Sequence, residues 1–397
     1  MQISDTARRD EAGAPPSKSR NLLVACLAHA MHDGYTDGIY AFLPVWQAQF
    51  ELSYAGLAVV RALYYGTMGG LQLPSDKLSR RFSPRAALAL STFIAAAGFL
   101  IMAFPIGFAG LCIGLVVAGV GSSIQHPRGS LLVSDTYGTA SRGPLGIYNF
   151  AGDLGKATLP AIAALLLPIF TWRPVIGMMA ILGMLVTLGL LYLAPTGHAT
   201  PTEATKKTAI GRSRSGFGLL AVIGAFDTST RMGYLLFLPF LIHGRGGTSA
   251  TVGLGLALLF IGGALGKATC NWLQGSMGVV GAVVVTEAAT ALMNAATLFT
   301  PLTATLVILP VLGVVLNGTS SVLYGTVPEL APSGDTGRAF AIFYTSVIGS
   351  GGVAPIVYGA IADHSSQSTG ILSAAATAAL IIPLVIALRP HLESHRT

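Results

Sequence analysis

The first long apolar stretch of the chain, residues 22–46, has the sequence LLVACLAHAMHDGYTDGIYAFLPVW. As a helix it is long enough to cross the roughly 30 Å hydrocarbon core of a bilayer. Two aspartates, Asp33 and Asp37, fall near its middle, where a charge facing lipid would be costly. The stretch has no convincing small-residue cleavage site, so we expect it to be a retained membrane helix that faces a polar interior.

This stretch has a counterpart in the second half of the chain. The residues Gly38, Phe42, Leu43 and Pro44 recur 195 residues later as Gly233, Phe237, Leu238 and Pro239. Further matches at nearly the same offset are the pairs Gly66 with Gly262, Gly70 with Gly266, Arg142 with Arg338, and Tyr148 with Tyr344. Parallel repeats of six helices follow from these matches, and transporters built in this way place their binding site between the repeats.

The composition indicates that lipid surrounds most of the chain. Of 397 residues, 52% are hydrophobic and 10% are charged, whereas soluble proteins carry about a quarter charged residues. We predict an all-α integral membrane protein of twelve transmembrane helices in two pseudo-symmetric six-helix bundles. The predicted spans are 22–46, 53–73, 86–105, 108–133, 143–167, 174–194, 217–242, 250–273, 279–299, 303–327, 339–361 and 370–388.

The polar segment 195–216 divides the chain into two halves. The predicted parts are a disordered tail (1–20), an N-terminal bundle (21–194), a linker (195–216), a C-terminal bundle (217–388) and a second tail (389–397). Loop lysines and arginines gather on the side of the linker, and two arginines, Arg173 and Arg245, fall in loops on the other side. By the positive-inside rule the linker and both termini are cytoplasmic, which suits a bacterial inner membrane. The net charge of +7 therefore reports topology and not nucleic-acid binding.

The segment after the second span carries a recognisable motif. Asp76-Lys77-Leu78-Ser79-Arg80-Arg81 resembles the acidic-basic loop motif of the major facilitator superfamily, and the resemblance covers essentially the whole chain. It implies that Asp76 and Arg80 stabilise one gating state at the cytoplasmic face. Two departures are Gln72, where the family has glycine, and the corresponding second-half loop 271–276, which has no acid.

A second motif, Gly121-Ser122-Ser123-Ile124-Gln125-His126-Pro127, is similar to a pattern of fosmidomycin-resistance-type exporters. The resemblance implies a secondary active transporter of a small organic solute that works by alternating access. Within it we expect proton-coupled export. The alternatives are an uptake symporter or exchanger for organic anions and, from another class, a transporter-like receptor or scaffold.

Ten charged residues lie inside the predicted spans, and each would cost about 2.5–3.5 kcal/mol at the centre of a lipid-facing helix. They must therefore face a cavity or one another. They are Asp33, Asp37, Arg61, Arg128, Asp153, Lys156, Asp227, Arg231, Lys267 and Glu287. Glu287 has no evident partner in the sequence, and Lys267 and Arg128 lie near the cytoplasmic ends, where they either snorkel or form gate contacts.

The two acids of the first span are candidates for proton coupling. Asp33 and Asp37 are four residues apart and share a helix face, so their mutual repulsion favours a proton on one of them. The alternative for Asp37 is a structural ion pair with Arg61. His126 either relays the proton or is a core histidine at a proline kink.

Two cations lie at mid-membrane depth in opposite halves, Lys156 and Arg231. We expect them to hold an anionic group of the solute between the halves. Each has an acid one helical turn away, Asp153 or Asp227, so the alternative is that each pair neutralises itself along its own helix. The expected substrate-binding set is Arg61, Tyr148, Asn149, Asp153, Lys156, Asp227 and Arg231, with Lys267 joining Asp76 and Arg80 in gating.

Several classes of function are disfavoured. Gly155-Lys156 and Gly266-Lys267 are each followed by alanine inside an apolar stretch, so neither is a Walker-type phosphate loop. The three cysteines also sit in apolar stretches, and no metal-spaced His/Cys motif occurs. We expect no enzymatic activity, no cofactor and no metal. The expected partners are a small solute, protons and the lipid bilayer, and the expected oligomeric state is a monomer.

Overall fold

The computed structural model describes residues 18–79, 81–193, 214–332 and 336–393, and the regular structure in these ranges is entirely helical. The first group of helices is α1 (Lys18–Phe50), α2 (Tyr54–Gly70), α3 (Gln72–Ser79), α4 (Pro84–Ala103), α5 (Gly107–Tyr137), α6 (Arg142–Leu166) and α7 (Trp172–Leu193). The second is α8 (Arg214–His243), α9 (Ser249–Ala296), α10 (Leu302–Leu330), α11 (Thr336–His364) and α12 (Gln367–Glu393). Most of the predicted tails and of the predicted linker lies outside the described residues.

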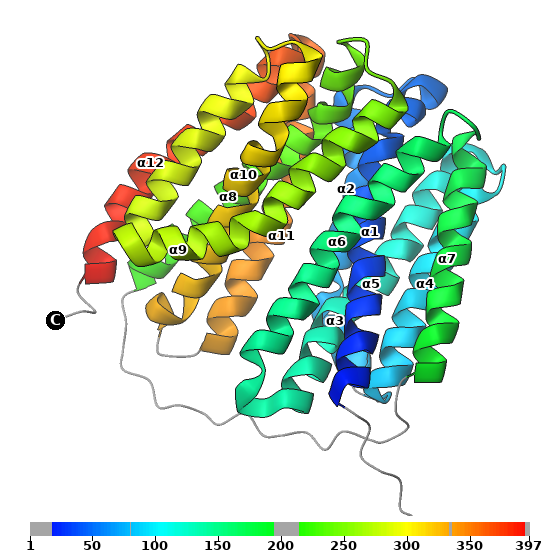
Figure 1. Ribbon diagram of the computed structural model, residues 1–397, viewed down its shortest axis with the longest axis horizontal. Coiled ribbons are helices and arrows are strands. Elements are labelled where there is room, and N and C mark those ends of the chain that lie inside the picture. Colours follow the sequence, from blue (N-terminus) through cyan, green and yellow to red (C-terminus); the bar gives the residue numbers. More distant parts are fainter. Residues whose placement is uncertain (1–17, 80, 194–213, 333–335, 394–397) are drawn as a thin grey trace, which may run out of the picture.

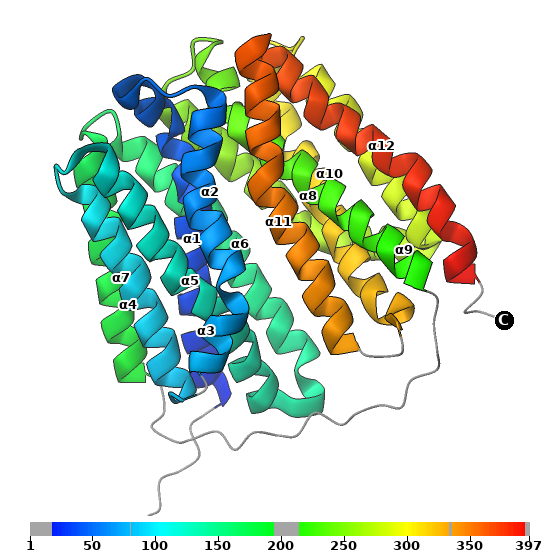
Figure 2. The same cartoon turned by 180° about the vertical axis from the view of Figure 1, so that it is seen from behind.

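The two groups of helices lie side by side (Figures 1 and 2). They meet at the end where α1 stops and α2 starts, and they splay apart at the end where α1 begins. The largest apolar core lies at the closed end and takes side chains from both groups. Phe42 and Leu43 of α1 and their repeat counterparts Phe237 and Leu238 of α8 are all at most 1% exposed. The repeated sequence pattern thus marks buried positions of this core in both halves.

Eight segments among the described residues are long and apolar enough to cross a membrane, which confirms the predicted helical membrane fold. They lie in α4, α5, α7, α10, α11 and α12 and in both parts of α9. The helices outside this set are short, as α2 is, or carry interior charges, as α1 does with Asp33, α6 with Lys156 and α8 with Arg231. These charged side chains lower the hydropathy of α1, α6 and α8, and they line the interior cavity.

The predicted second span, 53–73, is shorter in the structure. Helix α2 ends at Gly70 and α3 begins at Gln72, after a break at Leu71. The break places Pro74 in the first turn of α3. Backbone N–H groups in a first turn make no hydrogen bond within the helix, so proline is tolerated there. Asp76 therefore lies on a short helix, although its side chain and the whole of Arg80 lie outside the described residues.

The eighth and ninth predicted spans form α9, which changes direction at Gly278. This residue has φ of 75° and ψ of 175°, a conformation that a side chain would strain. The predicted boundary between 273 and 279 coincides with this break. The N-terminal part of α9, from Ser249 to this break, packs closely on α6, since a Cβ at Gly253 would lie 3.2 Å from Ala161 backbone atoms.

Candidate transport site

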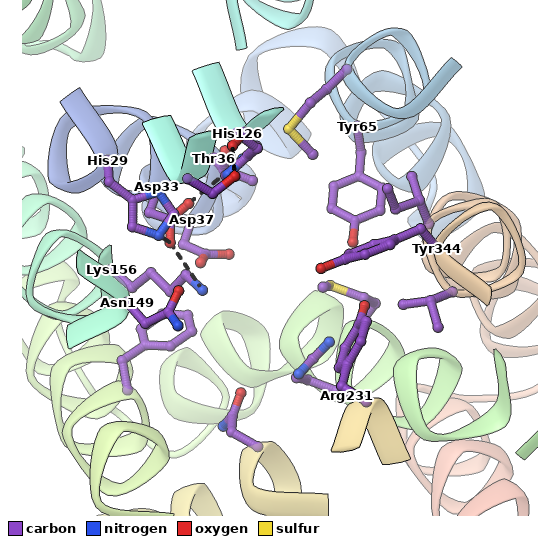
Figure 3. A pocket seen from close by; sticks show the side chains of 18 of the residues that line it. His29, Asp33, Thr36, Asp37, Tyr65, His126, Asn149, Lys156, Arg231 and Tyr344 are labelled. Atoms are coloured by element: carbon purple, nitrogen blue, oxygen red, sulfur yellow. Dashed lines mark hydrogen bonds and ion pairs between the residues drawn. The ribbon is translucent and has the colours of Figure 1, made fainter. Parts of the chain in front are cut away.

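A cavity of about 500 Å³ lies between the two groups of helices. Figure 3 shows Asp33, Asp37 and Lys156 on one wall and Tyr65, Tyr344 and Arg231 on the opposite wall. The lining side chains come from α1, α2, α3, α5 and α6 of the first group and from α8, α9, α10 and α11 of the second. Of the predicted proton-coupling residues, Asp33, Asp37 and His126 all line it.

Helix α1 supplies an acidic stripe because His29, Asp33 and Asp37 are spaced four residues apart on a continuous helix. Two glycines of α6 let the helices approach closely. A Cβ at Gly155 would lie 2.0 Å from the carbonyl oxygen of Ala30, and one at Gly152 would lie 2.5 Å from Asp33 Oδ2. The same close approach brings Lys156, the neighbour of Gly155, against Asp33.

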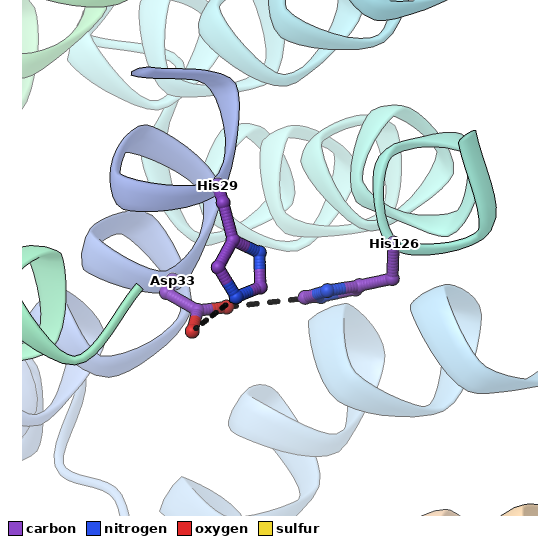
Figure 4. Close-up of side chains that lie close together, drawn as sticks. All are labelled: His29, Asp33 and His126. Atoms are coloured by element: carbon purple, nitrogen blue, oxygen red, sulfur yellow. Dashed lines mark ion pairs between the residues drawn. The ribbon is translucent and has the colours of Figure 1, made fainter. Parts of the chain in front are cut away.

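Asp33 is the centre of a cluster of basic groups (Figure 4). Lys156 Nζ lies 3.2 Å from Asp33 Oδ2, and the Nε2 atoms of His29 and His126 lie 3.6 and 3.8 Å from its two oxygens. Lys156 is farther from Asp153, at 3.9 Å. The pair of Asp153 and Lys156, which was the alternative along one helix, is therefore the longer of the two ion pairs that Lys156 makes.

Asp153 has its main partner in the other half of the chain. Lys267 Nζ of α9 donates a hydrogen bond to Asp153 Oδ2 at 2.6 Å. The Asp153 side chain is 8% exposed, whereas the lysine side chain is 39% exposed and lines the cavity. Lys267, predicted for gating from its depth, thus joins α6 to α9 along one side of the cavity.

Asp37 is 5% exposed on the cavity wall, and no residue that the structure describes hydrogen-bonds or ion-pairs with its carboxylate. Arg61, its alternative partner, is 1% exposed. The Arg61 guanidinium lies between the rings of Tyr40 and Tyr65, 4.8 and 4.7 Å from their centroids. It donates to the carbonyl of Gly351 at 3.3 Å and so packs between the two halves without lining the cavity.

The opposite wall carries Arg231 with a set of tyrosines. Arg231 Nη1 donates to Ser320 Oγ at 3.3 Å, and no acid among the described residues lies within ion-pair distance of its guanidinium. Tyr65, Tyr324 and Tyr344 also line the cavity. Sequence reasoning missed Tyr65 and Tyr324, since tyrosine in an apolar helix gives no distinctive signal. Tyr344 carries one, because it is the repeat counterpart of the cavity residue Tyr148.

Tyr148 and Asn149 of α6 both line the cavity. The Tyr148 ring stacks on His29 at 4.0 Å, and its hydroxyl accepts a hydrogen bond from Gln125 Nε2 at 3.2 Å. Asp227, in contrast, is 3% exposed inside the second group. It shares a hydrogen bond with Glu287, which is 2% exposed. Glu287 therefore finds in α8 the partner that its sequence neighbours do not provide.

The closed end of the cavity is held by contacts between α2 and α11. Asp363, at the end of α11, accepts hydrogen bonds from the backbone N–H groups of Tyr54 and Ala55 at 2.8 and 3.0 Å. These amides begin α2 and have no helical acceptor. The Tyr54 ring packs on Phe237 and Phe240 of α8, with centroids 5.4 and 5.1 Å away.

At the splayed end, Arg128 of α5 donates to the carbonyls of Ser79 and Phe82. These carbonyls lie at and just beyond the C-terminus of α3, where a cation is favourable. Arg128 is 6% exposed, so it is packed and does not snorkel. The segment that carries Asp76 is thereby fixed to the fourth predicted span.

A helical membrane protein with a charged cavity between two groups of helices has the architecture of a transporter. Residues 25–226 match the sequence model of the Major Facilitator Superfamily, and the chain belongs to this superfamily. Membership in this superfamily supports secondary transport of a small solute. The predicted resemblance to the superfamily is thus confirmed, and the similarity to a fosmidomycin resistance protein supports the expected branch.

Two curated relatives match part of the chain. The MFS-type transporter YfnC of Bacillus subtilis (strain 168) is 26% identical over 151 residues, 37% of this chain and 36% of the relative. The fosmidomycin resistance protein of Escherichia coli (strain K12) is 22% identical over 160 residues, 39% of each chain. The matches therefore span less than half the length of these relatives.

Solved structures show the same fold over nearly the whole chain. A bacterial homologue of the human lysosomal transporter Spinster, inward-facing and unoccupied, has a TM-score of 0.71 at 16% identity and covers 97% of this chain and 98% of its own. A POT family transporter in complex with a thioalcohol-conjugated peptide has a TM-score of 0.77 at 14% identity, covering 94% and 96%. At these identities the likeness concerns the fold alone.

Proposed function

We propose that the protein exports a small, organic, anionic solute across a bacterial inner membrane in exchange for protons. The observation that carries this proposal is the cavity itself, which has carboxylates of α1 on one wall and Arg231 on the other. Twelve spans in two pseudo-symmetric six-helix bundles (21–194 and 217–388) rock about it, with the linker and both termini in the cytoplasm. In that orientation the splayed end faces inward.

The proposed coupling step is an exchange of partners at Asp33. When Asp33 is ionised it holds Lys156 at 3.2 Å, and a proton on Asp33 removes that attraction. The released Lys156 ammonium and Arg231 then hold the anionic group of the solute from the two halves. Asp37, which has no partner among the described residues, is the second proton site.

Asp76 and Arg80 are proposed to act in gating, and Asp76→Asn is expected to slow transport without a loss of solute binding.

Export is favoured over uptake by the similarity to a fosmidomycin resistance protein. The same geometry also suits an uptake symporter or an exchanger for organic anions, because alternating access works in either direction. A receptor or scaffold role needs no solute translocation, so a transport assay separates that class from both.

The test begins with a thermal-shift screen of the purified protein against organic acids, phosphonates, metals and drugs, because a bound ligand raises stability by mass action. A compound that raises the melting temperature is then followed in proteoliposomes with an imposed pH gradient. Gradient-driven movement of the compound supports the proposal. Binding without any movement, in either direction, contradicts it and favours a receptor.

A further inference from the structure

Three side chains that are scattered in the sequence place metal-ligating atoms together on the cavity wall. These atoms of His29, Asp33 and His126 all lie within 4.8 Å of one another (Figure 4). The sequence predicts no metal site, because α1 and α5 contribute the ligands separately and no spacing motif links them. His29 and Asp33 are 7% and 6% exposed, and the His126 side chain is 28% exposed toward the cavity.

The separations within this cluster are too long for hydrogen bonds. The two Nε2 atoms lie 3.6 and 3.8 Å from the Asp33 oxygens, whereas an N–H···O bond spans about 2.7–3.2 Å. Within the described ranges neither Nε2 atom has a hydrogen-bond partner. A tetrahedral zinc ion with bonds of about 2.0–2.1 Å keeps its ligand atoms roughly 3.4 Å apart. The two nitrogen–oxygen separations of 3.6 and 3.8 Å are near that value, and the two nitrogens lie within 4.8 Å of each other.

The surroundings of His29 resemble the support of a metal ligand. Gln125 hydrogen-bonds with His29 Nδ1 at 3.3–3.4 Å, and Tyr148 stacks on the same ring at 4.0 Å. These contacts fix the imidazole so that Nε2 faces Asp33. Histidines that bind metals are commonly held through their other ring nitrogen in this way, and such partners strengthen metal binding.

Lys156 occupies the position of a competing cation. Its ammonium lies 3.2 Å from Asp33 Oδ2 and has a second acid, Asp153, at 3.9 Å. We infer that His29, Asp33 and His126 bind a divalent transition-metal ion of the Zn²⁺ type, and that Lys156 holds Asp33 in the absence of the ion and turns toward Asp153 when the ion binds. Two imidazoles and one carboxylate suit such an ion. The remaining coordination position faces the cavity.

The test is a calorimetric titration of the full-length protein, purified in detergent, with Zn²⁺. We expect one ion per chain in the wild type and an affinity lower by at least about tenfold in His126→Ala and Asp33→Asn, since loss of even a supporting residue costs about 10–100-fold. Lys156→Met should bind more tightly, because it removes the competing charge. His364→Ala, which alters an exposed histidine at the end of α11, is the matched control and should bind as the wild type does.

Two controls detect misfolding: the more conservative variant His126→Gln, and the melting temperature of every variant without metal. The proposal is overturned if the wild type binds no Zn²⁺, or if the variants of His126 and Asp33 bind it as tightly as the wild type. Weaker binding of Zn²⁺ in Lys156→Met would show that the lysine supports the ion, and it would contradict the proposed competition between the lysine and the ion for Asp33. The readout is binding, so these results stand apart from the outcome of the transport assay.

Discussion

The Lys156 ammonium lies 3.2 Å from the Asp33 carboxylate, so an ion pair joins α6 to α1 in the wall of the cavity. The lysine side chain is 31% exposed toward the cavity and the aspartate side chain 9%. A proton, a metal ion or the lysine can each neutralise Asp33, and any one of them excludes or weakens the others. The competition at this carboxylate links the binding of a cation to the freedom of Lys156.

Neutral replacement of the cavity acids should uncouple transport from the proton gradient. In Asp33→Asn and Asp37→Asn, proton-driven accumulation is expected to fall to background while solute exchange continues, because exchange needs the solute site and no net proton movement. The measurement is solute flux in proteoliposomes, with and without a pH gradient. Full gradient-driven transport in both variants would contradict the assignment of the coupling proton.

The two cavity cations should differ in what their removal does to stability. Lys156→Ala and Arg231→Ala are both expected to weaken solute binding, but Lys156→Ala also leaves Asp33 without its closest partner. Removing one partner of a buried pair costs about 3–5 kcal/mol, and partial exposure of the lysine lowers this to about 1–3 kcal/mol. Thermal unfolding in detergent should therefore show a larger loss for Lys156→Ala, and Lys156→Arg should recover most of it.

Solute affinity in the same variants tests the binding role separately. The identified solute is titrated against each folded variant, with His364→Ala as the control. Unchanged affinity in both cation variants would mean that these charges are structural, and the proposed anionic solute would lose its support.

The helices were predictable from the sequence because apolar length and glycine breaks are local properties. The pairing of the charges was not. Asp153 has Lys156 at helical spacing, yet its partner at 2.6 Å is Lys267 of α9. Sequence spacing reveals contacts along one helix, whereas these contacts depend on which faces of two helices meet. The absence of a side chain at Gly152 and at Gly155 lets α6 approach α1 and thereby brings Lys156 to Asp33.

The same limit applied to Glu287, whose partner Asp227 lies on another helix. A hydrogen bond between two carboxyl groups needs one proton, so Glu287→Gln can replace it with an amide donor. Glu287→Ala leaves Asp227 unsatisfied in the interior, which costs about 1–3 kcal/mol. We expect the melting temperature to fall clearly in Glu287→Ala and little in Glu287→Gln. An equal fall in both would show that packing, and not the hydrogen bond, is what Glu287 provides.

The proposed topology is tested by reporter fusions at four positions. Fusions at Glu51 and Gly247 should behave as periplasmic, and fusions at Ser83 and Thr208 as cytoplasmic, because the basic loops remain on the cytoplasmic side. The readout is the activity of a reporter that folds on one side of the membrane. Consistent reversal at all four positions would invert the proposed topology and make the splayed end face outward.

The Asp363 carboxylate should favour the conformation that is closed between α2 and α11. It accepts from the amides of Tyr54 and Ala55, so it caps α2 from the other half of the molecule. Loss of a helix cap costs about 1 kcal/mol, roughly a fivefold change in a two-state population. Asp363→Ala should therefore shift the protein toward the state open at this end. Spin labels at Glu51 and Ser366, in a background without the native cysteines, should report a larger long-distance fraction. Ser53→Ala is the matched control, because Ser53 caps α2 through the Gly56 amide from within the first group. A long-distance fraction that rises equally in both variants would mean that weakening α2, and not releasing α11, opens this end.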